Sequence, residues 1–158
     1  TAAYEHFTAL FGDLTLENID RPGDWFARAE EPLKTLWRWH AAEESEHKCV
    51  AFDLYAALGG NHKWRMRWFN YVLVQFTLDA LRQTVNNLWR DRTLHKPSTW
   101  ISAVRFLFGR HGLVRRIAKP LWAYRREDFH PMQVGHTDLA DQWLSRHADR
   151  WKAVGHPA

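Results

Sequence analysis

The chain has 158 residues, enough for one domain with a hydrophobic core. Its 46% of hydrophobic and 25% of charged residues exclude a disordered protein, and eight Gly and six Pro are too few for a turn-rich β-sandwich. The single cysteine, Cys49, excludes an internal disulfide framework and a Cys-rich zinc site. Because no apolar run reaches about 18 residues and no secretory leader is visible, we expect a cytoplasmic protein.

Helical periodicity predicts the elements from the N-terminus onward. Apolar and small residues at helical spacing predict a helix over 2–14, and Asp24 is a candidate N-cap for a short helix ending at 28. Residues 31–58 predict one helix of roughly 40 Å, with Pro32 in its first turn and Gly59-Gly60 at its end.

A second long helix is predicted over 62–92, a stretch that contains no Pro or Gly. Shorter helices follow over 98–108, 113–126 and 139–153. Since the sequence shows neither a strand pattern nor a repeat, we expect an all-α fold with two long helices and several shorter ones.

Charge divides the chain unevenly. Residues 1–60 carry 5 Lys and Arg against 11 Asp and Glu, whereas residues 61–158 carry 17 against 7. The acidic part suits a cation, and the basic part suits either a solvated face or an anionic membrane surface. Tryptophans lie among the basic residues, as interfacial helices require, at Trp64, Trp68, Trp89, Trp100 and Trp122. No DNA-binding or RNA-binding signature is present, so we expect no nucleic-acid partner.

The helix predicted over 31–58 carries two imidazoles and a carboxylate on one stripe. At 100° per residue, His40, Glu44 and His47 lie within about 60° of one another. Glu43 lies at the edge of this stripe, and Glu46 lies well off it. Apolar residues continue the stripe in both directions, so a carboxylate there needs a partner. A metal ion is the simplest partner for imidazoles and carboxylates together.

The pair Glu44-x-x-His47 has the ligand spacing of dimetal sites in four-helix bundles. Alone this spacing is weak, because an exposed, salt-bridged helix face produces it too. Glu5 is a second candidate metal ligand. The small residues Ala9 and Gly12 on its face would let another helix approach closely, which would turn Glu5 inward. The alternative role of Glu5 is to stabilise the N-terminus of its own helix.

Two specific stretches are Tyr4-Glu5-His6-Phe7-Thr8-Ala9 and Trp39-His40-Ala41-Ala42-Glu43-Glu44-x-Glu46-His47-Lys48-x-Val50-Ala51-Phe52-Asp53. With Phe129-His130-Pro131, they resemble the predicted metal-dependent hydrolase family. The resemblance implies part of a ferritin-like helical bundle that holds a divalent metal, Fe or Zn, or a dimetal centre. We expect a single domain over 1–158, with the metal-site helices in 1–96 and a basic part of short helices in 97–158.

The resemblance implies that Glu5, Glu44 and His47 are metal ligands. His40 is then a further ligand or a proton shuttle, and Glu43 either contacts the ligands without binding the metal or is the general base. Family members extend further at the N-terminus and supply another Glu and a Gln-Glu-x-x-His helix there, so these residues are half a site. A missing N-terminal segment or a second copy in a homodimer would complete it, or the chain is inactive alone.

Glu127-x-x-His130 and Asp79 offer a competing set of ligands within the chain. Against this set, His130 precedes Pro131, which disfavours a regular helix there. Three functions stay open: a metal-dependent hydrolase acting on an unidentified small molecule, a di-iron oxidase or oxygenase with the same ligands, and a non-catalytic helical module. The module would bind a membrane surface or a protein partner through the basic part.

Overall fold

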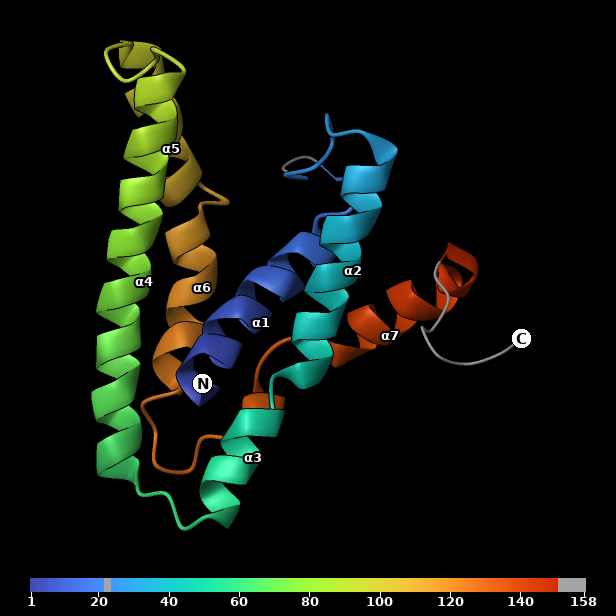
Figure 1. Ribbon diagram of the computed structural model, residues 1–158, viewed down its shortest axis with the longest axis vertical. Coiled ribbons are helices and arrows are strands. Elements are labelled where there is room, and N and C mark those ends of the chain that lie inside the picture. The colour runs from blue at the N-terminus through green and yellow to red at the C-terminus, as the bar shows by residue number, and fades with distance from the viewer. Residues whose placement is uncertain (22–23, 151–158) are drawn as a thin grey trace. The chain divides into compact units, whose positions relative to one another are not determined.

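The computed structural model describes residues 1–21 and 24–150, and this part of the chain is helical without strands (Figure 1). The helices are α1 (Ala2–Glu17), α2 (Glu31–His47), α3 (Val50–Ala57), α4 (His62–Arg90), α5 (Pro97–Phe108), α6 (Leu113–Ala123) and α7 (Thr137–Arg146). Short 3₁₀ turns lie on either side of α7, η1 (Pro131–Gln133) before it and η2 (Ala148–Arg150) after it. The all-α prediction is therefore confirmed. Within the same residues, no helix is long and apolar enough to cross a membrane.

The chain divides into two compact units. Among the described residues, the first unit comprises 1–21, 24–53 and 130–150, and the second unit comprises 54–129. The expectation of a single domain over 1–158 stays a prediction.

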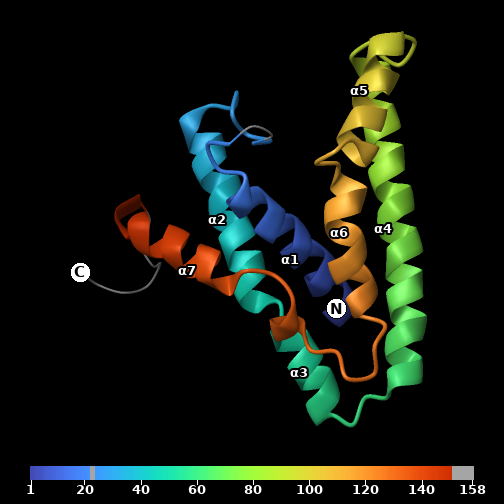
Figure 2. The same cartoon turned by 180° about the vertical axis from the view of Figure 1, so that it is seen from behind.

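In the first unit α1 packs against α2, and α7 packs against both (Figure 2). Gly12 is buried at the α1–α2 crossing, where a Cβ atom would lie 2.6 Å from the backbone oxygen of Ala41. A side chain at this position would push the helices apart, so glycine allows the close approach that the small residues of α1 predict. The apolar core beside the crossing contains Leu16, Ala41, Ala42, Ala140 and Trp143.

The prediction of one continuous helix over 31–58 is wrong, because α2 ends at His47 and α3 begins at Val50. Contacts that are distant in sequence stabilise this break. The buried Lys48 donates a hydrogen bond from Nζ to the Val134 carbonyl oxygen at 2.9 Å. The Glu5 carboxylate accepts a hydrogen bond from the Ala51 N–H at 2.9 Å and so stabilises the start of α3.

The short helix expected to follow Asp24 is also absent, since the described residues there form turns. Asp24 does accept a backbone hydrogen bond as an N-cap would, from the Phe26 N–H at 2.9 Å. Its other oxygen bonds Arg38 of α2 at 2.8 Å, which holds the turn on that helix.

The later helices follow the predicted order with small differences at their ends. α4 and α5 begin and end within two residues of the predicted bounds, whereas α6 stops at Ala123, three residues early. The last predicted helix, 139–153, is shorter than expected: α7 ends at Arg146 and η2 follows. Residues 151–153 of that prediction lie outside the described part.

The second unit is held together by aromatic contacts between α4 and the end of α6. Phe69 stacks on Tyr124 with ring centroids 4.9 Å apart, and both side chains are fully buried. The Arg65 guanidinium lies over the same Tyr124 ring at 5.4 Å. These contacts determine which face of α4 points inward.

Candidate metal site

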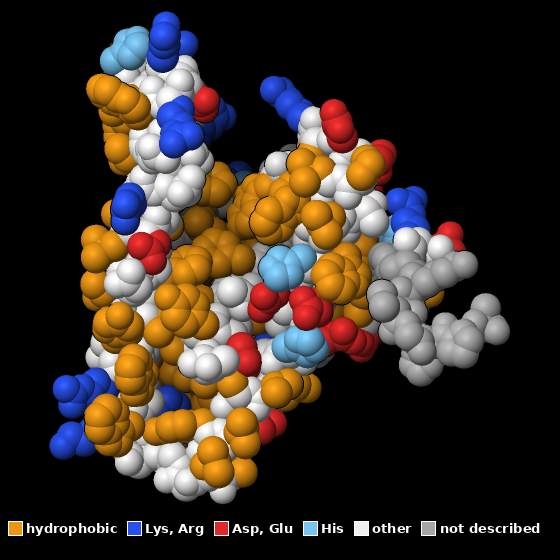
Figure 3. Space-filling view, in the orientation of Figure 1, with side chains coloured by type: hydrophobic (Ala, Val, Ile, Leu, Met, Phe, Trp, Pro, Cys, Tyr) orange, Lys and Arg blue, Asp and Glu red, His pale blue; other side chains and the backbone are white. Residues whose placement is uncertain are grey.

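Acidic and imidazole side chains gather on α2 next to α1, with apolar side chains around them (Figure 3). His40 makes the central contacts. Its Nδ1 atom lies 3.4 Å from Glu43 Oε2, and its Nε2 atom lies 3.6 Å from Glu44 Oε1. The Trp37 ring meets the His40 imidazole edge-on, with centroids 5.9 Å apart. The helical stripe predicted from the sequence thus brings His40 and Glu44 together.

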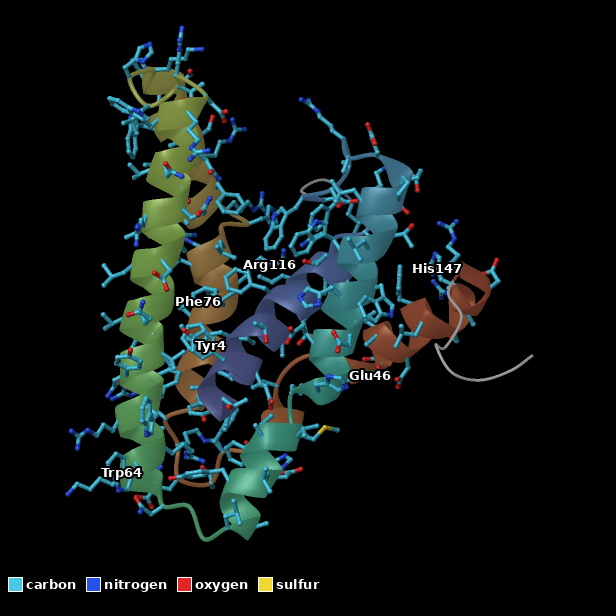
Figure 4. The ribbon with its side chains drawn as sticks, viewed as in Figure 1. Tyr4, Glu46, Trp64, Phe76, Arg116 and His147 are labelled. Carbon is cyan, nitrogen blue, oxygen red and sulfur yellow. The ribbon has the colours of Figure 1, made fainter. Side chains whose placement is uncertain are left out.

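His47 contacts Glu43 and not Glu44, the residue with which the Glu44-x-x-His47 spacing pairs it. His47 Nδ1 lies 3.3 Å from Glu43 Oε1, so the Glu43 carboxylate bridges the two imidazoles one helical turn on either side. Glu46 lies near the C-terminal end of α2 and is exposed, as expected for a residue off the stripe (Figure 4).

Glu44 is partly buried, with 24% of its side chain exposed, and it has partners within the protein. The Thr8 hydroxyl of α1 donates a hydrogen bond of 2.5 Å to Glu44 Oε2. Glu44 therefore has the partner that the sequence predicts it needs, because Thr8 and His40 contact its two oxygens, while a metal as a further partner stays a prediction. The hydroxyl holds the carboxylate in one orientation, with Oε1 toward His40.

Glu5 lies one turn before Thr8 on α1, and its contact is with α3. The bond from the Ala51 N–H makes Glu5 a cap of that helix. Glu5 also lies in the first turn of α1, as the sequence predicts for a residue that stabilises the N-terminus of its own helix, so it can act on both helices.

A metal ion fits parts of this arrangement but not all of it at once. Two ligand atoms at about 2 Å from one tetrahedral ion lie roughly 3.3 Å apart. The His40–Glu44 and His47–Glu43 contacts, at 3.6 and 3.3 Å, are close to that separation. Among the described residues, however, no group of three or more His, Cys, Asp or Glu side chains is arranged to hold a metal ion. The chain thus presents pairs of donors and not a complete coordination shell.

A family model described as predicted metal-dependent hydrolase matches residues 1–135. The chain belongs to this family. The match includes the helices that carry Glu5, His40, Glu43, Glu44 and His47, and it extends through the Phe129-His130-Pro131 stretch. The resemblance noted from the sequence is therefore confirmed. No curated protein and no solved structure matches the chain significantly.

In the competing ligand set, the Glu127-x-x-His130 pair is not on a helix, whereas Asp79 is on α4. Glu127 lies in the turns after α6, and His130 directly precedes η1, as its Pro131 neighbour predicts. His130 Nε2 lies 2.8 Å from Asp53 Oδ1, and its Nδ1 accepts a bond from the Met132 N–H at 3.3 Å. Asp79 is exposed on α4 and accepts a bond from Gln75. A helical Glu-x-x-His at 127–130 is thus excluded.

Asp13 and Ser45 form a buried polar pair in the same α1–α2 interface that the sequence did not predict. The Ser45 hydroxyl donates to Asp13 Oδ1 at 2.8 Å, and Lys48 lies near the same carboxylate. Burial raises the pKa of Asp13, while the bond from Ser45 and the charge of Lys48 oppose that rise. The sequence does contain a signal: Asp13 follows Ala9 by one turn, on the face where small residues admit the other helix.

Proposed function

We propose that this chain is a metal-dependent hydrolase in which His40 and Glu44 bind a divalent metal, with Glu43 as the general base. The observation that carries the proposal is the contact of His40 with both carboxylates while Thr8 orients Glu44. An imidazole and a carboxylate that are held in place before the metal binds lose little conformational entropy on binding it. Membership of the family supports the hydrolytic class of the reaction.

Further ligands are needed, because a pair of donors leaves most of a coordination shell open. His47 and Glu5 are the nearest candidates in sequence and in helix position. Because 57% of the His47 side chain is exposed to solvent, it has room to change rotamer and so to leave Glu43. A second copy of the chain, or protein residues beyond this sequence, would supply the rest.

The chain's own residues have distinct roles in such a reaction. A bound divalent ion would lower the pKa of a coordinated water and polarise the substrate oxygen. Glu43 lies between the two imidazoles and, as the general base, would accept the proton that the water loses. Zinc suits the imidazoles, whereas iron suits a carboxylate-rich set.

The proposal can be tested by comparing the metal affinity of the Glu44→Gln variant with that of the Glu46→Gln variant. Both variants remove one carboxylate charge from the last turns of α2, but only Glu44 contacts His40. Equilibrium dialysis against Zn²⁺ and Fe²⁺ should show a loss of at least tenfold in affinity for Glu44→Gln and no change for Glu46→Gln. Equal affinities for the two variants, or no bound metal in the unmodified protein, would contradict the proposed site.

The reaction class is tested separately with activated ester and phosphoester substrates. Hydrolysis should stop on chelation, return with the added metal, and fall strongly in Glu43→Gln although the metal is retained. Oxygen consumption by the iron-loaded protein, without hydrolysis, would instead indicate an oxidase.

A further inference from the structure

Along α4 runs a row of apolar side chains that the second unit does not cover. Each has between 45% and 71% of its surface exposed: Trp64, Trp68, Tyr71, Val74, Leu78, Leu81, Val85 and Trp89. At 100° per residue they lie within an arc of about 140° and extend for roughly 38 Å along the axis. We call these residues the α4 stripe. Figure 3 shows the apolar side chains along this helix.

The stripe is distinct from the face by which α4 packs in its own unit. Arg65, Phe69 and Val72 are buried, and they lie on the other side of the helix. Phe69 contacts Trp122 and Tyr124 there. Since monomeric proteins rarely expose continuous apolar patches of more than a few hundred square ångströms, the stripe calls for a binding partner.

Charge around the stripe identifies the chemistry of that partner. The second unit carries 14 Lys and Arg against 4 Asp and Glu. Arg82 lies within the arc of the stripe, and Arg67 lies over the Trp64 ring at 5.1 Å. The tryptophans are near the ends of α4 and the aliphatic residues are between them. Tryptophan and arginine together are typical of the boundary between lipid headgroups and acyl chains.

We propose that the α4 stripe binds the surface of an anionic lipid bilayer, with α4 lying in the plane of the headgroups. Apolar side chains would enter the acyl region, while Arg82 and the basic residues near the ends would contact phosphates. A second copy of the chain fits less well, because self-association along α4 would bring two Arg82 side chains and two strongly basic units together. This inference does not depend on the metal site.

Vesicle flotation with matched variants of α4 tests the proposal. Leu78→Gln with Val85→Gln removes apolar surface from the centre of the stripe without changing charge. Thr77→Gln with Thr84→Gln is the control, since both threonines are exposed, each precedes a stripe residue, and neither lies on the stripe. We expect the unmodified protein and the control to float with vesicles of phosphatidylcholine and phosphatidylglycerol at about 3:1. The stripe variant should bind at least fivefold less, with an unchanged circular dichroism spectrum.

The contribution of charge to binding is measured in two further experiments, with vesicles of phosphatidylcholine alone and with anionic vesicles at higher salt. Binding should fall severalfold in both cases, because exposed charges are screened at high ionic strength. Equal flotation of the stripe variant and the control, or no binding to anionic vesicles by the unmodified protein, would overturn the proposal. So would a dimer, seen by sedimentation, that the stripe variant alone converts to monomer while vesicle binding is absent.

Discussion

Two carboxylates of the first unit, Asp24 and Asp13, have pKa values that move in opposite directions. At Asp24 burial raises the pKa, but hydrogen bonds from Phe26, Asp20 and Arg38 outweigh it and leave the pKa lowered. At Asp13 burial dominates and the pKa is raised. A lowered pKa in the folded state stabilises the protein above the unfolded pKa, and a raised one costs stability there.

Asp24→Asn should reduce the free energy of unfolding at neutral pH by about 1–2 kcal/mol, because the charge-assisted bonds from Arg38 and the backbone weaken. The stabilisation by Asp24 is present above the unfolded pKa, near 3.9, and is lost as pH falls through the lowered folded pKa. Urea unfolding at pH 7 and at the lowest pH where the protein stays folded measures this. The gap between the two proteins should narrow in acid, and a gap independent of pH would contradict the account.

Asp13 should show the opposite pH dependence. The cost of burying its ionised form is fully present above the raised folded pKa and disappears as pH falls toward the unfolded value. Relative to Asp13→Asn, the unmodified protein should therefore gain unfolding free energy as the pH is lowered from 7 toward 4. The same urea experiments measure it. A loss of relative stability over this range would show that the Lys48 charge, and not burial, dominates at Asp13.

At the break between α2 and α3, one candidate metal ligand, Glu5, also stabilises the start of a helix. Glu5 is assigned to the metal by the family resemblance, while in the structure it caps α3 through the Ala51 N–H. Glutamine retains an oxygen that accepts this bond but lacks the charge, whereas alanine removes both. Substitutions at one position can thus separate the two roles.

Glu5→Ala should destabilise α3 by about 1 kcal/mol, as the loss of a helix cap does, and speed hydrogen exchange of the α3 amides. Glu5→Gln should leave that exchange nearly unchanged. If Glu5 also ligates the metal, both variants should lose metal affinity in equilibrium dialysis. Fast α3 exchange in Glu5→Gln would show that the negative charge, and not the hydrogen bond, stabilises the helix.

The same break shows why the sequence predicted helices better than their junctions. Residues 31–58 have uniform helical periodicity, and nothing local marks Lys48 as a buried residue. Its partner, the Val134 carbonyl, is 86 residues away in the chain, so only the folded structure reveals it. Likewise, the helical stripe correctly predicts the approach of His40 to Glu44, but the contact of Thr8 with Glu44 depends on how α1 crosses α2.

In the whole molecule, the proposed metal site and the α4 stripe belong to different units. The first unit holds the acidic and imidazole cluster, and the second unit holds the α4 stripe and most of the basic charge. The uneven charge that the sequence shows between residues 1–60 and 61–158 approximates this division. The return of the chain from His130 onward to the first unit could not be predicted, because it depends on tertiary contacts such as those of Lys48 and His130.

The binding of a divalent metal by His40 and Glu44 can be followed by ¹⁵N NMR of the histidine imidazoles during a Zn²⁺ titration. The His40 signals, assigned by their loss in His40→Gln, should shift before those of the exposed His95 in the second unit, and this shift should be absent in Glu44→Gln. If His40 shifts no earlier than His95, or if its shift persists unchanged in Glu44→Gln, the cluster on α2 is not a metal site.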